Sequence, residues 1–315
     1  MASSIEIATE KVGKLVLCIG WTCIDIVNIV EFFPKEDADS KIVEYYWQRG
    51  GNANNSSTVL SVLGRSCELL SVIAKNSREY EFLMSDINKY GIKTDNCVFV
   101  DKNQCPLSTA ILSLETGSRT ILHTLRDIPE ITHEDFSPIF DQSNKYSWIH
   151  FEGRPNIKTI CNLIVQLDEL RNRKEITTSV ELEHPYIESL ELLLDKGDYV
   201  FLSKDYAKFR GFSDKNEAVE TLSTSIKDGA TIVCAWGEDG AAAMLKGGEL
   251  VSVPALKLEN MIDSLGAGDT FNASFINATL DGLTLKECLI YACQVAGTKC
   301  CMKGYDGLSK FRKKE

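Results

Sequence analysis

Apolar residues gather in short runs that alternate with segments of helical periodicity. Six runs of β-branched and other apolar residues are predicted to be strands, at residues 14–20, 68–74, 146–151, 177–182, 198–202 and 231–236. Because strands of a parallel sheet are buried on both faces, they appear in a sequence as nearly continuous apolar runs. The pattern therefore favours parallel strands.

Between these runs, apolar positions recur every three or four residues. This spacing predicts helices at residues 52–63, 77–90, 157–173, 216–227, 268–280 and 285–302. An alternation of strands and helices over this length predicts a doubly wound, mostly parallel α/β sheet with helices on both faces.

Two stretches, 23–47 and 98–126, break the alternation. In the second, segments 108–114 and 119–125 flank the turn Glu115-Thr116-Gly117-Ser118, which predicts a hairpin outside the main sheet. We expect both stretches to form a small β-sheet lid over one end of the core. The prediction is a single domain, residues 1–315, with its core at 14–22, 48–97 and 127–309 and its lid at about 23–47 and 98–126.

Composition excludes several classes of partner. The net charge of −11 argues against a nucleic-acid partner, because binding a polyanion needs a concentrated basic surface. No run of about 18 uncharged apolar residues is present, so we expect no membrane span, no export and a cytoplasmic location. The 11 cysteines include no Cys-x-x-Cys pair, which favours reduced thiols over a disulfide framework.

The strongest chemical signal is Asp263-Ser264-Leu265-Gly266-Ala267-Gly268-Asp269, directly before a predicted helix. Glycines permit a tight turn, and the first amides of a helix have no partner within it, so such a turn attracts phosphate groups. Asp269 falls in the first helical turn, where it either stabilises the helix terminus or acts on a substrate. Asp263 places a second carboxylate near the same pocket, where it could organise the loop or a hydrated cation.

A second signal is Trp47-Gln48-Arg49-Gly50-Gly51-Asn52-Ala53-Asn54-Asn55-Ser56. Amide side chains at a helix start offer the directional donors and acceptors that a polyhydroxylated ligand requires. The alternative is ordinary helix capping, in which asparagine and serine are common. Asp25 is a third candidate because it follows the first predicted strand, and ligands bind beyond the carboxyl ends of parallel strands.

These two motifs, in this order and at this separation, resemble the signatures of the ribokinase-like (PfkB) carbohydrate kinases. Within that family the likeness is to the ketohexokinase branch, the hepatic-type fructokinases, and it extends over residues 15–308. It includes Phe33-Pro34-Lys35-Glu36-Asp37, Gly117-Ser118-Arg119-Thr120, Trp148-Ile149-His150-Phe151-Glu152-Gly153-Arg154 and Val233-Cys234-Ala235-Trp236.

The resemblance implies a role for each matching residue. It implies that Asp25, Gly51, Asn52 and Asn55 hold the sugar and that Asp269 is the catalytic base. It also implies an ATP site formed by Arg119, Gly237, Glu238, Asp239, Gly240, Gly266, Ala267, Gly268 and Asp269, with Lys204 adding positive charge near the phosphates.

The activity implied is phosphorylation of a ketohexose, D-fructose to fructose 1-phosphate, with ATP as co-substrate and Mg²⁺ as metal. The resemblance further implies a homodimer formed through the lids, and a monovalent cation near Asp263 is possible. The chain departs from the wider family at Ser264, where threonine is common, and at Ser203-Lys204-Asp205, which replaces an Asn-x-x-Glu motif. The magnesium ligands are therefore not assigned.

Three other functions stay open at this point. A related kinase for another sugar or a nucleoside would keep Asp269 and change the sugar contacts. A non-catalytic sugar-binding relative would not need Asp269 and Arg119, which are both present. A dehydrogenase would need Gly-x-Gly-x-x-Gly after the first strand, and residues 20–25 lack it.

Overall fold

A computed structural model of the chain describes residues 13–116, 118–170, 172–258 and 261–313. In this part of the chain the main sheet has eight strands in the order β14-β13-β12-β11-β10-β9-β1-β4. Their bounds are β1 Leu15–Ile19, β4 Cys67–Leu70, β9 Tyr146–Glu152, β10 Thr177–Leu182, β11 Tyr199–Leu202, β12 Thr231–Ala235, β13 Ala241–Leu245 and β14 Val251–Val253. Strands β4, β1 and β9 to β12 run parallel, and β13 and β14 pair antiparallel at one edge.

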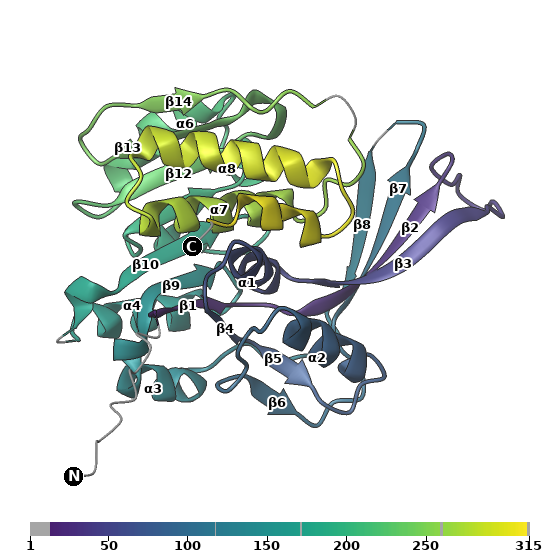
Figure 1. The fold of residues 1–315 in the computed structure, drawn as a ribbon, viewed down its shortest axis with the longest axis horizontal. Coiled ribbons are helices and arrows are strands. Elements are labelled where there is room, and N and C mark those ends of the chain that lie inside the picture. Colours follow the sequence, from purple (N-terminus) through teal and green to yellow (C-terminus); the bar gives the residue numbers. More distant parts are fainter. Residues whose placement is uncertain (1–12, 117, 171, 259–260, 314–315) are drawn as a thin grey trace, which may run out of the picture.

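Helices cover both faces of this sheet. Their bounds are α1 Asn52–Val62, α2 Tyr80–Lys89, α3 His133–Asp141, α4 Ile157–Asp168, α5 Lys204–Phe209, α6 Lys215–Leu222, α7 Ala267–Leu280 and α8 Leu285–Cys300. The chain moves from β1 to β4 in one direction and from β9 to β12 in the other, so right-handed crossovers place α1 opposite α4, α5 and α6. Figure 1 shows α1, α7 and α8 side by side on one face. The predicted doubly wound α/β fold is confirmed.

Aromatic packing fixes α7 on the sheet. Phe275 of α7 is fully buried and lies edge-on to Phe201 of β11, with 5.6 Å between the ring centroids. Trp148 of β9 is equally buried and lies tilted against Tyr199, which also contacts Phe275. Rings of this size bury large areas and favour such edge-on arrangements, so α7 has a defined position against β11.

A separate four-stranded sheet, ordered β3-β2-β7-β8, forms the predicted small lid. Its strands are β2 Cys23–Val30, β3 Ile42–Gly50, β7 Leu107–Ser113 and β8 Arg119–Thr124, and β7 and β8 form the predicted antiparallel hairpin. Gly117 of the connecting turn lies outside the described residues. The lid extends from one end of the core (Figure 1). Its inner face packs on the core loop before α7 through Val27, Ala110 and Leu265.

The expected lid boundaries differ from the observed strands at two places. The expected lid range 98–126 includes β6 (Val98–Val100), which instead pairs with β5 (Val72–Ala74) in a two-stranded sheet of its own. Strand β5 is the second half of the predicted strand 68–74, which ends its pairing with β1 at Leu70. At the other place, β3 continues to Gly50, into the range expected for the core.

In the described residues, no helix is both long enough and apolar enough to cross a membrane. All 11 cysteines lie in this part of the chain, and each is unpaired. Most of them are buried, as expected for reduced thiols that pack like small apolar side chains.

Candidate active site

The starts of α1 and α7 meet at the carboxyl end of the main sheet. The two helices pack against each other on the same face, as Figure 1 shows. Asn55, in the first turn of α1, donates a hydrogen bond from Nδ2 to Oδ2 of Asp269, in the first turn of α7, over 2.7 Å. The two sequence motifs, 214 residues apart at these positions, therefore meet at a single buried point.

The turn before α7 depends on glycine. Gly266 is the N-cap of α7 and has a φ of 74°, a left-handed conformation that glycine adopts without strain. A Cβ at this position would lie 2.1 Å from the hydroxyl of the buried Tyr305, so no larger residue fits. At Gly268, which is exposed, a Cβ would meet open space, so the first turn of α7 presents its backbone to solvent rather than to packed protein. The first amides of this helix can therefore face a bound anion.

Asp25 lies against the start of α1. It is buried in β2, and a Cβ at Gly50 would lie 2.3 Å from its Oδ2, so glycine permits this close approach. Gly51, with a φ of 96°, turns the chain into α1. Burial raises the pKa of Asp25, and hydrogen bonds from Ser108 and Cys23 oppose that rise. The carboxylate is thus held in a fixed position at the junction of lid and core.

Two glutamates that sequence reasoning missed contact the predicted sugar residue Asn52. Its Nδ2 donates to Glu181 Oε2 over 3.2 Å and also to an oxygen of Glu183. Glu181 lies in β10, near its carboxyl end, and accepts a second bond of 2.7 Å from Asn272 of α7. A charged residue at the carboxyl end of an otherwise uncharged strand is the sequence signal that could have found them.

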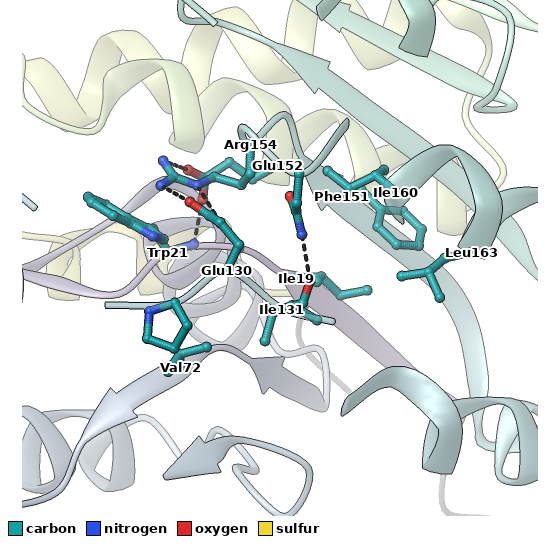
Figure 2. A pocket seen from close by; sticks show the side chains of 13 residues that line it. Ile19, Trp21, Val72, Glu130, Ile131, Phe151, Glu152, Arg154, Ile160 and Leu163 are labelled. Carbon is teal, nitrogen blue, oxygen red and sulfur yellow. Dashed lines mark hydrogen bonds and ion pairs between the residues drawn. The ribbon is translucent and has the colours of Figure 1, made fainter. Parts of the chain in front are cut away.

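A third missed acid, Glu152, ends strand β9. It accepts hydrogen bonds from the backbone amides of Trp21, over 2.8 Å, and Ala53, over 3.2 Å. Figure 2 shows the guanidinium of Arg154 between Glu152 and Glu130 and over the ring of Trp21, 3.8 Å from its centroid. The guanidinium offsets part of the negative charge of Glu152, and Glu152 links the segment after β1 to the start of α1.

The buried acids shift one another's protonation. Burial raises the pKa of Asp269 well above its usual range, and the nearby negative charge of Glu183 raises it further. The hydrogen bond from Asn55 acts in the opposite direction, because it stabilises the ionised form. Burial and Glu183 likewise raise the pKa of Glu181. A carboxylate at Asp269 is therefore a stronger proton acceptor than an exposed aspartate.

Arg119 connects the lid to the glycine turn. Its Nη1 donates to the backbone oxygen of Ser264 over 2.5 Å and to the Ser264 hydroxyl over 2.9 Å. Since the side chain is exposed at the first residue of β8, its remaining donors are available to a ligand.

The predicted nucleotide turn, Gly237 to Gly240, follows the carboxyl end of β12, so it lies at the same end of the sheet as the start of α7. Glu238 forms an ion pair with Lys204 of α5 over 2.6 Å, which lowers the pKa of Glu238. Lys204 thus lies beside this turn, and the backbone oxygen of Asp239 accepts a hydrogen bond from Lys215 at the start of α6. Within the described residues, no hydrogen bond or ion pair joins this turn to Asp269.

The acidic side chains of this site suit a metal ion that arrives bound to a nucleotide. In the described ranges, no three histidine, cysteine or acidic side chains are close enough together to hold one ion. Mg²⁺ at phosphoryl-transfer sites is held by one or two carboxylates, substrate phosphates and water rather than by a protein cage. The buried acids beside the glycine turn fit that mode of binding.

Residues 14–309 match the pfkB family of carbohydrate kinases. The chain belongs to this family. Among curated pfkB relatives, a ketohexokinase from Mus musculus is 38% identical over 300 residues, covering 94% of this chain and 99% of that protein. A nucleoside kinase from Methanocaldococcus jannaschii is 21% identical, covering 88% of this chain and 87% of the relative. The expected resemblance to ketohexokinases is confirmed, and this pfkB protein is a carbohydrate kinase.

Solved structures show the same fold. An Arabidopsis thaliana ribokinase complexed with ribose and ATP superposes with a TM-score of 0.73 at 18% identity, covering 95% of this chain and 97% of the other. A ribokinase from Thermotoga maritima gives a TM-score of 0.72 at 18% identity, covering 94% and 95%. The pfkB chain therefore has the ribokinase-like fold over nearly its whole length.

Proposed function

We propose that this kinase transfers the γ-phosphoryl group of ATP to the 1-hydroxyl of a ketohexose, converting D-fructose to fructose 1-phosphate. The observation that carries the proposal is the hydrogen bond between Asn55 and Asp269, because it joins the amide-rich helix start to the glycine turn. The 38% identity to the murine ketohexokinase supports the choice of sugar.

In this scheme Asp269 is the catalytic base. The 1-hydroxyl oxygen attacks the γ-phosphorus, the bond from that phosphorus to the bridging oxygen breaks, and ADP leaves. The hydroxyl proton passes to the Asp269 carboxylate. The raised pKa of Asp269 suits this role, and Asn55 holds the carboxylate in position. Asp25, Gly51 and Asn52 would hold the remaining hydroxyls.

The residues from Gly266 to Gly268 would bind the triphosphate through their amides, and Arg119 would add a cationic fork that suits phosphate oxygens. The turn from Gly237 to Gly240 would border the nucleotide, with Lys204 beside it. Bound Mg²⁺ would supply charge neutralisation to the phosphates. The protein's own contribution is positioning and proton removal, and no covalent intermediate is needed.

We also propose that the protein acts as a homodimer formed through its lids, in the cytoplasm. Val43, Tyr45 and Trp47 alternate along β3 and point away from the inner face of the lid, where Tyr46 packs. Leu122 of β8 lies on the same outer face and is also exposed. An apolar face of this kind, on a sheet with two edge strands, is typical of an association surface. Light scattering after size exclusion would give the mass of the assembly and test this.

The function is tested by measuring ATP consumption against a panel of ketoses, aldoses and nucleosides, with the phosphorylated carbon identified by NMR. The expected result is turnover with D-fructose and a product phosphorylated at carbon 1. A clear preference for a nucleoside, as the name of the archaeal relative suggests, would assign a different acceptor to the same site. Absence of ATP turnover with every acceptor would contradict the catalytic assignment.

A further inference from the structure

A buried lysine lies directly behind the glycine turn. Lys299 is in the last turn of α8, and its side chain is 1% exposed. Its ammonium group donates to Oδ2 of Asp263 over 2.6 Å and to the backbone oxygen of Asp263 over 3.0 Å. The Asp263 side chain is also 1% exposed, so this ion pair is removed from water on both sides.

The same contacts hold the segment that leads into α7. The other carboxylate oxygen of Asp263 accepts a bond from the amide of Leu265 over 2.9 Å. The backbone amides of Ile262 and Asp263 both donate to the carbonyl oxygen of Cys300, next to Lys299 in the chain. Leu265 precedes Gly266, so these bonds attach the base of the glycine turn to the end of α8.

Charge makes the lysine necessary. Asp263 is three residues before Gly266, so its carboxylate borders the turn that would receive a triphosphate. An uncompensated buried carboxylate is costly, and it would also repel phosphate in a medium of low dielectric constant. Arg119, the other cation at this loop, is exposed and bonds Ser264 rather than Asp263. In the described part of the chain, Lys299 is the only cationic group within ion-pair distance of Asp263.

The local environment is consistent with a charged pair. Burial lowers the pKa of Lys299, and the adjacent Asp263 carboxylate opposes this by favouring the ammonium form. The ammonium also lies 5.7 Å from the centroid of the Tyr305 ring, whose face favours a cation.

We propose that Lys299 is a positioning residue for the phosphate-binding turn and that its ammonium group is the fixed counter-charge that lets Asp263 border a nucleotide. The inference rests on the proposed kinase function and deepens it. It assigns the role to Lys299 through Asp263, with no contact between Lys299 and the substrate.

The test compares three variants that change the net charge of the pair in different directions. Lys299→Met leaves one negative charge, Asp263→Asn leaves one positive charge, and the double variant leaves none. ADP affinity is measured by calorimetry on the full chain without sugar. Lys299→Met is expected to weaken ADP binding about tenfold or more. Asp263→Asn should bind ADP as well as or better than the original protein, and the double variant should be within about threefold of it.

Kinetics separate this role from simple stabilisation. Lys299→Met should raise the KM for ATP while the KM for the sugar stays within about twofold, because only the phosphate turn is affected. An equal rise in the KM for both substrates would overturn the charge argument. An equal loss of ADP affinity in all three variants would overturn it as well. Should Lys299→Met fail to fold, Asp263→Asn decides alone, since weakened ADP binding there contradicts the proposal. If the original protein binds no ADP at all, the proposed function itself fails, whereas a wrong sugar assignment leaves the ADP result untouched.

Discussion

Replacement of Asp269 with asparagine removes the proposed base and keeps its shape. The asparagine side chain has the same size, and its oxygen can still accept the hydrogen bond from Asn55 Nδ2, which is 2.7 Å long in the original protein. What is lost is the ability to take the proton of the attacking hydroxyl. A positioned base contributes roughly 10²- to 10⁴-fold, so kcat should fall by about that factor, or about 3 to 5 kcal/mol of transition-state stabilisation.

The stability of the Asp269→Asn variant should not fall as its kcat does. The pKa of Asp269 is raised in the folded protein, so the folded state binds this proton more tightly than the unfolded state does. This contribution to stability is present at low pH and is lost as pH rises through the folded pKa. Above that folded pKa the original protein carries a disfavoured carboxylate, and the asparagine variant does not. Its free energy of unfolding should therefore be unchanged or higher.

The assay is steady-state ATP turnover with D-fructose, together with calorimetric ADP binding and urea denaturation. A matched control is Asp281→Asn, at the opposite end of α7 and about 18 Å along the helix axis. Asp281 pairs with Arg65, so the control should lose some stability and keep kcat. Near-normal turnover of Asp269→Asn would refute the assignment of the base. Loss of both folding and ADP binding would refute the view that its charge is disfavoured.

Three further predictions concern the same site. Gly266→Ala should lower the melting temperature and abolish ADP binding, because the backbone φ is 74° there and the new Cβ would overlap the Tyr305 hydroxyl. Gly268→Ala, where the new Cβ meets open space, should keep the melting temperature and raise the KM for ATP. The pH profile of kcat/KM should lose activity on the acid side as Asp269 becomes protonated, at a pH above the ordinary range for aspartate, and a midpoint within that range would contradict the burial argument. Arg154→Met should lower the free energy of unfolding, measured by urea denaturation, by about 3 to 5 kcal/mol because it leaves the buried Glu152 and the half-buried Glu130 unpaired. A loss below about 1 kcal/mol would show that Glu152 becomes neutral instead.

Much of the fold can be predicted from the sequence because buried apolar positions recur with the period of each strand or helix. The six predicted apolar runs all contain strands of the main or the adjoining sheet. Strand β13 escaped prediction because Ala241–Leu245 is rich in alanine, which is uncommon in strands, and β14 escaped because it has only 3 residues. Helices α3 and α5 are short, 9 and 6 residues, and offer too few turns for a period to emerge. The predicted helix 157–173 ends at Asp168 because Arg173 turns back to pair with Asp168 and Asp198, partners that no local pattern reveals.

The sequence alone determined the glycine positions, since Gly51 and Gly266 occupy backbone conformations that are a local property of the chain. It also determined which helix starts carry Asn55 and Asp269. Only the tertiary structure decided that these side chains meet, and that Glu181 and Glu183 lie beside Asn52. It alone decided that Lys299 neutralises Asp263, 36 residues away. The physical reason is that electrostatic partners are selected by distance in space, and a charged residue in a sequence looks the same whether water or another buried charge surrounds it.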